Sequence, residues 1–362
     1  MTSTSPQGTG DATTGGPGGG ARTTKLATAG AGAVGSPQAY AALMRGAART
    51  VALLDVNRAK VEAEVLDLQH GIQFMPMARV EGSDDVAVCA GADVVVVTAG
   101  AKQKPGQTRL DLAEGTIGLM RTILPGLVEV APDAVYVMVT NPVDIVTYAA
   151  LKFSGLPPTQ LFGSGTVLDS SRLRFLVAQH CGVAVQNVHA YIAGEHGDSE
   201  IPLWSSATIG GAPLLEWQGI GGRGPLTGDV RDEIAREVVQ SAYRIIEGKG
   251  ATNYAVGLAG TRIIEAVLAD EHRVLPVSTL LDGIYGLEDV CLSLPTLVDR
   301  RGATERVEVP LADDELAGLR SSAESLRAVA RRFGLCAPGP SGPARRGPRG
   351  GGGARPAGGR GR

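Results

Sequence analysis

His196 is the side chain in this chain best suited to proton transfer, because an imidazole titrates near neutral pH. It lies in the run GEHGDSE at residues 194–200, where the glycines would let a substrate approach the ring. Asp169, in the run GSGTVLDSSRLR at residues 163–174, is a candidate partner. A carboxylate bonded to one ring nitrogen fixes the tautomer, so that the other nitrogen can transfer a proton. Without that partner, a structural histidine would be an equally good interpretation.

Two arginines and one amide are candidates for substrate recognition. Arg172 follows Asp169 by three residues, on the same face of a helix, and could hold a carboxylate through two hydrogen bonds. Such a pair is also ordinary on a helix surface. Gln103 and Arg109 lie in a polar segment at residues 101–111 that follows a buried strand. Ligands of open α/β sheets bind beyond the carboxyl ends of the strands, so we expect both side chains to contact a ligand.

A glycine turn predicts a dinucleotide site near the start of the chain. Gly30, Gly32 and Gly35 have the GxGxxG spacing between a strand and a helix, which lets a pyrophosphate approach the helix N-terminus. Asp55 ends the next strand, where a carboxylate binds both ribose hydroxyls and repels a 2′-phosphate. This pattern favours NAD over NADP.

Two further residues lie where a ligand of the sheet would be reached. Asn141 follows a buried strand, so its amide is expected at the ligand edge. Thr252 precedes a predicted helix, where it is either a plain N-cap or a substrate contact.

The elements that position these residues alternate between strand and helix from residue 25 onward. Strands are expected at residues 26–29, 51–55, 94–98, 135–140 and 161–163, with helices between them. This alternation predicts an α/β fold, a doubly wound parallel sheet of the Rossmann type. After about residue 166 the pattern becomes mixed α+β. Strands are expected at residues 188–193, 201–207, 209–215, 274–281 and 306–309, and helices at 167–180, 229–247, 252–268 and 313–333.

Four segments follow from this pattern. Residues 1–24 and 336–362 are expected to be disordered tails, residues 25–165 an NAD-binding domain, and residues 166–335 a catalytic α+β domain.

Composition excludes several classes of function. Aromatic residues make up only 4% of the chain and the net charge is −3, so we expect no nucleic-acid partner. The last segment carries six arginines and could touch an anionic surface, although a solvated extension is the simpler interpretation. No apolar run is long enough to cross a membrane and no signal peptide is visible. The four scattered cysteines predict neither disulfides nor a metal site, and favour a cytoplasmic protein.

The motifs together resemble the L-lactate dehydrogenase family, within the lactate/malate dehydrogenase superfamily. The resemblance covers about residues 25–335 and depends on the combination of GAGAVG, DVN, TAGAKQKPGQTRLDL, TNPVD, GSGTVLDSSRLR, GEHGDSE, GKGATNY and LPVSTLLDGIYG. It implies reversible, NAD-dependent conversion of pyruvate to (S)-lactate, the reaction that ends fermentative glycolysis.

The resemblance also implies roles for individual residues. His196 would donate and accept the proton, Asp169 would orient it, and Arg109 would polarise the reacting carbonyl. The expected substrate-binding residues are Gln103, Arg109, Asn141, Arg172 and Thr252. The expected NAD-binding residues are Gly30, Gly32, Val34, Gly35, Asp55, Thr98, Gly100 and Asn141.

Gln103 distinguishes two enzymes that the motifs allow. Malate dehydrogenases resembling this chain have an arginine at the matching position, which pairs with the second carboxylate of oxaloacetate. A neutral Gln103 would leave that charge unpaired, at a cost of several kcal/mol, roughly a thousandfold in discrimination. Malate dehydrogenase or a broader 2-hydroxyacid dehydrogenase remains the alternative. A catalytically silent NAD-binding protein and a polyanion binder acting through its basic tail are alternatives of other classes.

Regulation and assembly are further implications of the resemblance. Arg174 and His189 match positions that bind fructose 1,6-bisphosphate between subunits in allosteric bacterial members. A basic pair facing its symmetry mate would repel it, and a bisphosphate would relieve that repulsion. An exposed arginine and an unrelated histidine are an equally good interpretation of these two residues. The family is usually tetrameric, so a homotetramer is expected.

Overall fold

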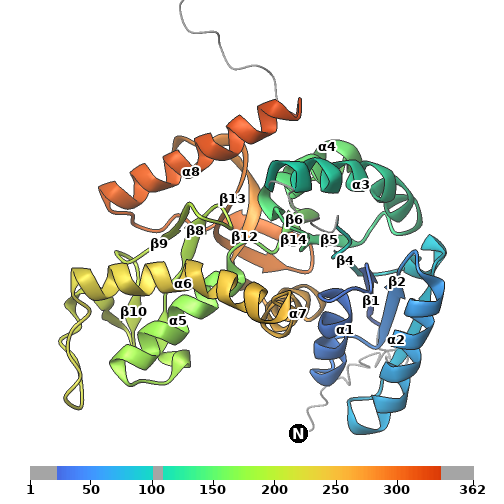
Figure 1. Ribbon diagram of the computed structural model, residues 1–362, viewed down its shortest axis with the longest axis horizontal. Helices are drawn as coiled ribbons and strands as arrows, with labels where there is room; N and C mark the ends of the chain where they lie inside the picture. Colours follow the sequence, from blue (N-terminus) through green and yellow to red (C-terminus); the bar gives the residue numbers. More distant parts are fainter. Residues whose placement is uncertain (1–22, 101–108, 336–362) are drawn as a thin grey trace, which may run out of the picture.

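The computed structural model describes residues 23–100 and 109–335, and its centre is one long sheet (Figure 1). Within that part of the chain the sheet has 11 strands. Its first half is parallel, in the order β3-β2-β1-β4-β5-β6, which is the strand order of a doubly wound dinucleotide-binding fold. The strands are β1 (Lys25–Ala29), β2 (Thr50–Leu54), β3 (Arg79–Ser83), β4 (Val94–Val97), β5 (Val135–Met138) and β6 (Leu161–Gly163).

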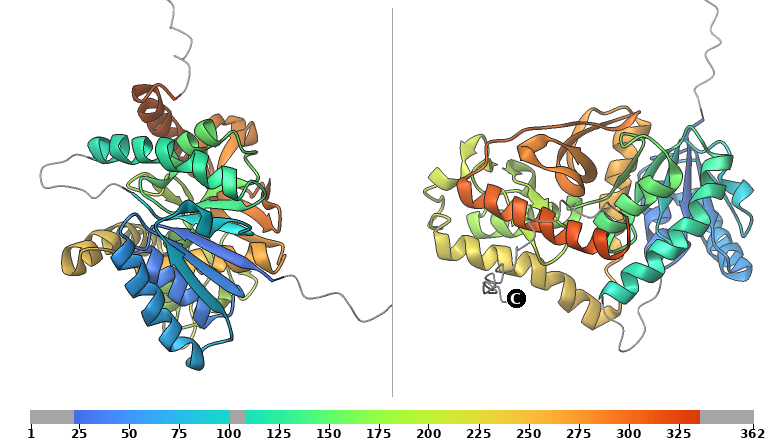
Figure 2. Two further views of the ribbon diagram at one scale, coloured as in Figure 1. Left: turned by 90° about the vertical axis from the view of Figure 1, so that its right-hand side faces the viewer. Right: turned by 90° about the horizontal axis from the view of Figure 1, so that it is seen from above.

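Helices cover both faces of this parallel half (Figures 1 and 2). Successive side chains of a strand point to opposite faces. Val94 and Val96 therefore pack with α1, α2 and α7, whereas Val95 and Val97 pack with α3 and α4. The helices are α1 (Gly35–Met44), α2 (Arg58–Gly71), α3 (Arg109–Val130) and α4 (Val143–Ser154), with short 3-10 turns at Ile72–Phe74 and Val86–Cys89.

The second half extends the same sheet with antiparallel strands in the order β6-β12-β13-β8-β9, and β14 pairs with β13. These strands are β8 (Ile192–Gly194), β9 (Glu200–Pro202), β12 (Arg273–Asp282), β13 (Glu288–Asp299) and β14 (Gly302–Arg306). A small second sheet contains β7 (Val188–His189), β10 (Thr208–Ile209) and β11 (Ala212–Pro213). The helices are α5 (Val167–Cys181), α6 (Gly228–Lys249), α7 (Tyr254–Leu268) and α8 (Asp313–Arg332), with 3-10 turns at Val185–Asn187, Leu214–Glu216 and Ile284–Gly286.

The predicted fold class, a doubly wound parallel sheet followed by a mixed α+β region, is confirmed, but several strands differ from prediction. β3 and β13 were not expected, and Pro295 inside β13 argues against a central strand by sequence alone. The expected strand at residues 188–193 is divided into β7 and β8, which belong to different sheets. Only short parts of residues 201–207 and 209–215 are extended, and β14 ends where the strand at residues 306–309 was expected to begin.

The helix expected at residues 313–333 begins at Asp313 as predicted, and the N–H of the preceding Ala312 donates to Glu315 Oε2 at 2.9 Å. The helix expected from residue 252 begins two residues later, at Tyr254 of α7. Asn253, not Thr252, caps α7, since its side chain accepts from the Tyr254 N–H at 3.0 Å.

Some predictions concern residues that lie wholly or partly outside 23–100 and 109–335. The predicted tails lie almost wholly outside the described residues, as does Cys336, while Cys89, Cys181 and Cys291 are buried free thiols. A search of the described helices finds none with the length and apolar character to cross a bilayer.

Candidate functional site

The glycine turn predicted for a dinucleotide joins β1 to α1 at the carboxyl edge of the parallel sheet. Gly30 has a φ of 109°, and a Cβ there would lie 2.6 Å from the Ala99 nitrogen. The Thr98 hydroxyl donates to the Gly30 carbonyl at 2.6 Å, which ties the end of β4 to the turn. The turn is therefore held against the end of the neighbouring strand, where ligands of this fold bind.

Gly32 and Gly35 have different reasons to lack a side chain. A Cβ on Gly35 would lie 1.9 Å from the Gly30 carbonyl oxygen, so this glycine lets the helix pack against the turn. A Cβ on Gly32 would meet nothing within 4 Å among the described residues, so this glycine keeps the space in front of the turn open. Val34 precedes α1 without a side-chain cap, and the first turn of α1 carries no acidic residue. The N-terminus of α1 therefore suits a phosphate.

Asp55 lies directly after β2 and beside the glycine turn. Its Oδ2 accepts the Ala31 N–H at 3.0 Å, and its Oδ1 accepts the Asn57 N–H at 3.0 Å. Each oxygen keeps a second lone pair, which a ribose hydroxyl could use. The residues of this edge therefore fit the NAD predicted for it.

Of the other residues predicted for this site, Gly100 and Asn141 follow the neighbouring strands β4 and β5, and Thr252 precedes α7. Asn141 follows β5, the neighbour of β4, and its side chain is exposed ahead of a cis peptide bond to Pro142. Gly100 is exposed, and a Cβ there would lie 2.3 Å from the Thr140 methyl group. Thr252 is half-buried, and its neighbours Asn253 and Tyr254 line a cavity of about 670 Å³ together with Gly32. Most of that cavity lies along α1 and α2, away from the carboxyl edge, so we assign no cofactor to it.

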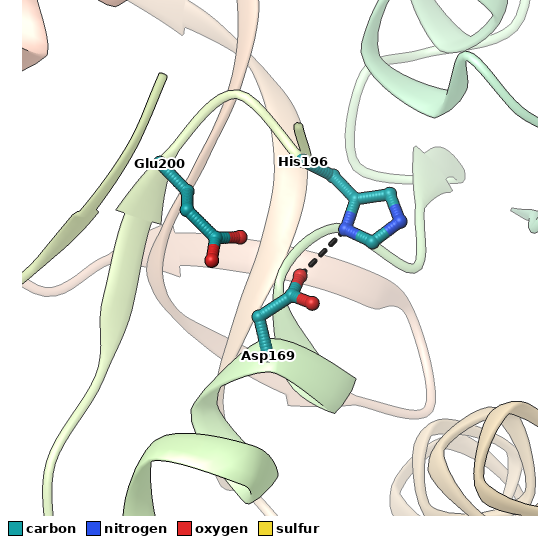
Figure 3. Close-up of side chains that lie close together, drawn as sticks. All are labelled: Asp169, His196 and Glu200. Atoms are coloured by element: carbon teal, nitrogen blue, oxygen red, sulfur yellow. Dashed lines mark hydrogen bonds and ion pairs between the residues drawn. The ribbon is translucent and has the colours of Figure 1, made fainter. Parts of the chain in front are cut away.

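His196 and Asp169 form the pair that the sequence predicted. The Nδ1 atom of His196 lies 2.5 Å from Asp169 Oδ2, and the second ring nitrogen points away from the carboxylate (Figure 3). Asp169 is buried in the first turn of α5, whereas 23% of the His196 side chain is exposed. One nitrogen is therefore fixed, and the other is available to a ligand.

The surroundings of the pair favour a protonated imidazole. Burial lowers the pKa of His196, but the charge and hydrogen bond of Asp169, with smaller contributions from Asp144 and Glu200, outweigh it and raise the pKa to about 9. Burial likewise raises the pKa of Asp169, while His196 and Arg172 lower it, and the net direction is down. The pair is therefore an ion pair at neutral pH, with a proton to donate.

Arg172 extends the pair into a triad of charges. Its Nη1 donates to Asp169 Oδ1 at 2.8 Å, and 14% of its side chain is exposed. A guanidinium has five N–H donors, so this contact leaves others for a substrate carboxylate. The interpretation as an ordinary surface pair is excluded by burial, since Asp169 is only 2% exposed.

Asp144 is a residue of this site that the sequence analysis missed. It is buried in α4, accepts the His196 backbone N–H at 2.8 Å, and accepts the Ser278 hydroxyl at 2.6 Å. Burial raises the pKa of Asp144 to about 6, although both hydrogen bonds oppose the rise. Asp144 therefore fixes the backbone of the loop that carries His196. Its position at the start of the helix after TNP was the available signal.

The two residues predicted to bind a bisphosphate lie near each other on adjoining elements. The Arg174 Nε donates to the Ala190 carbonyl at 2.8 Å, and the guanidinium stacks on the Tyr191 ring at 5.0 Å. His189, the residue before Ala190, is exposed on β7. Gln103 lies outside the described residues, and Arg109 is the first residue of α3.

Comparison with known proteins matches both halves of the chain to one family. The NAD binding domain of lactate/malate dehydrogenase matches residues 24–163, and the alpha/beta C-terminal domain of the same family matches residues 166–332. An L-lactate dehydrogenase of Bifidobacterium animalis subsp. lactis is 59% identical over 312 residues, which cover 86% of this chain and 98% of that protein. An L-lactate dehydrogenase of Thermoanaerobacter sp. (strain X514) is 44% identical over 311 residues, which cover 86% of this chain and 99% of that protein.

Solved structures give the same result. A lactate dehydrogenase from a Medee basin deep-sea metagenome library superimposes with a TM-score of 0.83 at 35% identity, covering 87% of this chain and all of that one. The minor L-lactate dehydrogenase of Enterococcus mundtii superimposes with a TM-score of 0.80 at 38% identity, covering 86% of this chain and 98% of that one.

The glycine turn allows a test with two alanine variants. Gly32→Ala adds a methyl group to open space, so we expect a change in unfolding free energy within about 1 kcal/mol but a loss of NADH affinity of about tenfold or more. Gly35→Ala forces a methyl group onto the Gly30 carbonyl, so we expect destabilisation by roughly 1–3 kcal/mol. Thermal unfolding and NADH fluorescence titration measure the two effects. Unchanged NADH affinity in Gly32→Ala would contradict this cofactor site.

Proposed function

Because the chain belongs to the lactate/malate dehydrogenase family, we propose that it is an L-lactate dehydrogenase, which interconverts pyruvate and (S)-lactate with NAD as its cofactor. The observation that carries this proposal is the buried Asp169 bonded to His196, with Arg172 on its other oxygen. This set supplies a proton donor and a carboxylate anchor within one site. Both are needed to reduce a 2-oxo acid.

The residues at the carboxyl edge would hold the cofactor. The glycine turn and the N-terminus of α1 bind the pyrophosphate, Asp55 binds the ribose, and the other contacts come from the end of β4 and from Asn141. NAD supplies the hydride chemistry when bound, while the protein supplies geometry and charge.

The substrate is held at one end and polarised at the other. Arg172 binds the carboxylate of pyruvate, and Asn141 and Thr252 line the pocket. Arg109, at the start of α3, polarises the carbonyl. His196 then donates its proton to the developing alkoxide, and Asp169 stabilises the imidazolium until transfer occurs. Lactate oxidation runs the same steps in reverse and starts from a neutral His196.

Gln103 sets the preference for pyruvate over oxaloacetate. A neutral amide leaves the second carboxylate of oxaloacetate without a counter-charge, and an unpaired charge in a desolvated site costs several kcal/mol, roughly a thousandfold in selectivity. The protein acts in the cytoplasm, consistent with its scattered thiols and with buried, unbridged Cys89, Cys181 and Cys291.

The enzyme assembles as a homotetramer that fructose 1,6-bisphosphate activates. Support for assembly comes from large apolar side chains exposed on helices α2, α5 and α6: Leu66, Phe175, Tyr243 and Ile246. Support for the activator comes from Arg174 and the exposed His189, which lie on adjoining elements.

The activator is tested by binding and assembly together. We expect fructose 1,6-bisphosphate to lower the apparent KM for pyruvate by about fivefold or more, a coupling of about 1 kcal/mol, and to favour the tetramer in analytical ultracentrifugation. Arg174→Gln should lose this response and keep activity at saturating pyruvate. If neither the KM nor the oligomeric state responds in the wild type, regulation at Arg174 and His189 is excluded.

The proposed reaction is tested by NADH oxidation with pyruvate, oxaloacetate and longer 2-oxo acids. We expect kcat/KM for pyruvate to exceed that for oxaloacetate by roughly a thousandfold, and Gln103→Arg to reverse the preference because it supplies the missing counter-charge. A wild-type preference for oxaloacetate would contradict the assignment, and no turnover of any 2-oxo acid would exclude a dehydrogenase of this class.

A further inference from the structure

Glu200 is a second carboxyl group beside the Asp169–His196 pair, and the mechanism above does not use it. It is the first residue of β9 and pairs with Gly194 of β8, so the hairpin that carries His196 returns Glu200 to the same place. One oxygen of Glu200, one oxygen of Asp169 and a ring nitrogen of His196 all lie within 4.8 Å of one another (Figure 3). The carboxyl group therefore faces the proton donor directly.

The surroundings of Glu200 offer little to stabilise a negative charge on its carboxyl group. Its Oε1 is shut off from solvent and has no hydrogen-bond partner among the described residues. Ionised oxygens in such a position cost several kcal/mol unless they are paired or hydrogen-bonded. This environment favours a protonated carboxyl group at neutral pH.

The charges around Glu200 come from α5 and from the loop before β9. α5 contributes Asp169 and Arg172, and the loop before β9 contributes His196 and Asp198, whose carboxylate accepts the hydroxyl of Tyr243 from α6. α8, which packs against β9, presents the neutral Gly318 and Ser322. Burial, followed by the charge of Asp169, raises the pKa of Glu200 to about 8, against the opposing charges of His196 and Arg172.

We propose that Glu200 is a positioning residue that acts through His196: by losing its own proton in mildly alkaline solution, it sets how firmly His196 holds the proton used in catalysis. This role rests on the proposed function and adds a pH response to it. When Glu200 is neutral, the imidazolium is stabilised by Asp169 with a smaller contribution from Asp144. When Glu200 is ionised, a further negative charge lies close to the ring and opposes its deprotonation.

The sign of the effect follows from which form of His196 each direction needs. Pyruvate reduction needs the imidazolium, so ionised Glu200 extends reduction to higher pH. Lactate oxidation needs the neutral ring, so the same charge delays its rise with pH. The surroundings raise the pKa of Glu200 to about 8 and that of His196 to about 9, so the two protons are lost as a coupled pair.

Glu200→Gln removes the ionisation and keeps the size of the side chain. At alkaline pH, kcat/KM for pyruvate falls as His196 loses its proton, and we expect this alkaline limb of the pH profile to move to lower pH by about one unit. At pH values below the fall, kcat/KM should stay within about twofold of the wild type. The rise of lactate oxidation with pH should move down by the same amount. Asp198→Asn is the matched control, because it removes a negative charge that acts on Glu200 from the same loop but is not one of the groups that lie within 4.8 Å of the His196 ring nitrogen, and it should shift the limb by less than about 0.3 unit.

Several results would overturn the role of Glu200. These are an unshifted or upward-shifted limb in an active Glu200→Gln variant, an equal shift in Asp198→Asn, or a folded variant inactive at all pH values. If Glu200→Gln does not fold, Glu200→Ser must give the same downward shift, because any neutral side chain removes the charge. NMR titration of the His196 ring without substrate measures the change in its pKa directly and needs no turnover. Lack of pyruvate turnover by the wild type would therefore refute the proposed function but leave this titration decisive for Glu200.

Discussion

The hydrogen-bonded ion pair between Asp169 and His196 is the contact on which the site depends. Its two partners come from different elements, since Asp169 lies in the first turn of α5, which follows β6, and His196 follows β8. Two antiparallel strands, β12 and β13, lie between β6 and β8 in the sheet, so the second half of the fold sets the separation of the pair. The 2.5 Å contact therefore depends on how β6, β12, β13 and β8 pair, and the cofactor edge lies at the carboxyl ends of the parallel strands that continue from β6.

Charge balance explains why so many ionisable groups gather at this point. A buried aspartate is stable only if it is paired, and Asp169 is paired twice, with His196 and with Arg172. Asp144 holds the backbone of His196, and Glu200 adds a carboxyl group whose charge depends on pH. The reacting proton thus lies among three carboxyl groups and one guanidinium, where each ionisation changes the others.

Sequence predicted the parts of the molecule that depend on local pattern. The glycine spacing, the carboxylate at the end of the second strand and the GEHGDSE run each indicated a residue whose surroundings fit the predicted role, and the strand–helix alternation gave the fold class. It did not predict β13, because Pro295 and the charged residues at its ends are unusual in a central strand. The strand forms because it pairs with its neighbours in the sheet. Asp144 and Glu200 were quoted within motifs but not recognised, because their roles come from contacts across 52 residues of chain and around a hairpin. The spacing of Asp169 and Arg172 is equally typical of an ordinary pair on a helix surface. Only their burial in the structure shows that they belong to the site.

The measurement that tests this account most directly is kcat/KM for pyruvate in Asp169→Asn. An amide keeps the shape of the side chain but removes the charge that stabilises the imidazolium, so we expect kcat/KM to fall by about a thousandfold or more while the NADH dissociation constant changes by less than about twofold. A fall of less than about tenfold in a folded, NADH-binding variant would contradict the central role of the Asp169–His196 pair.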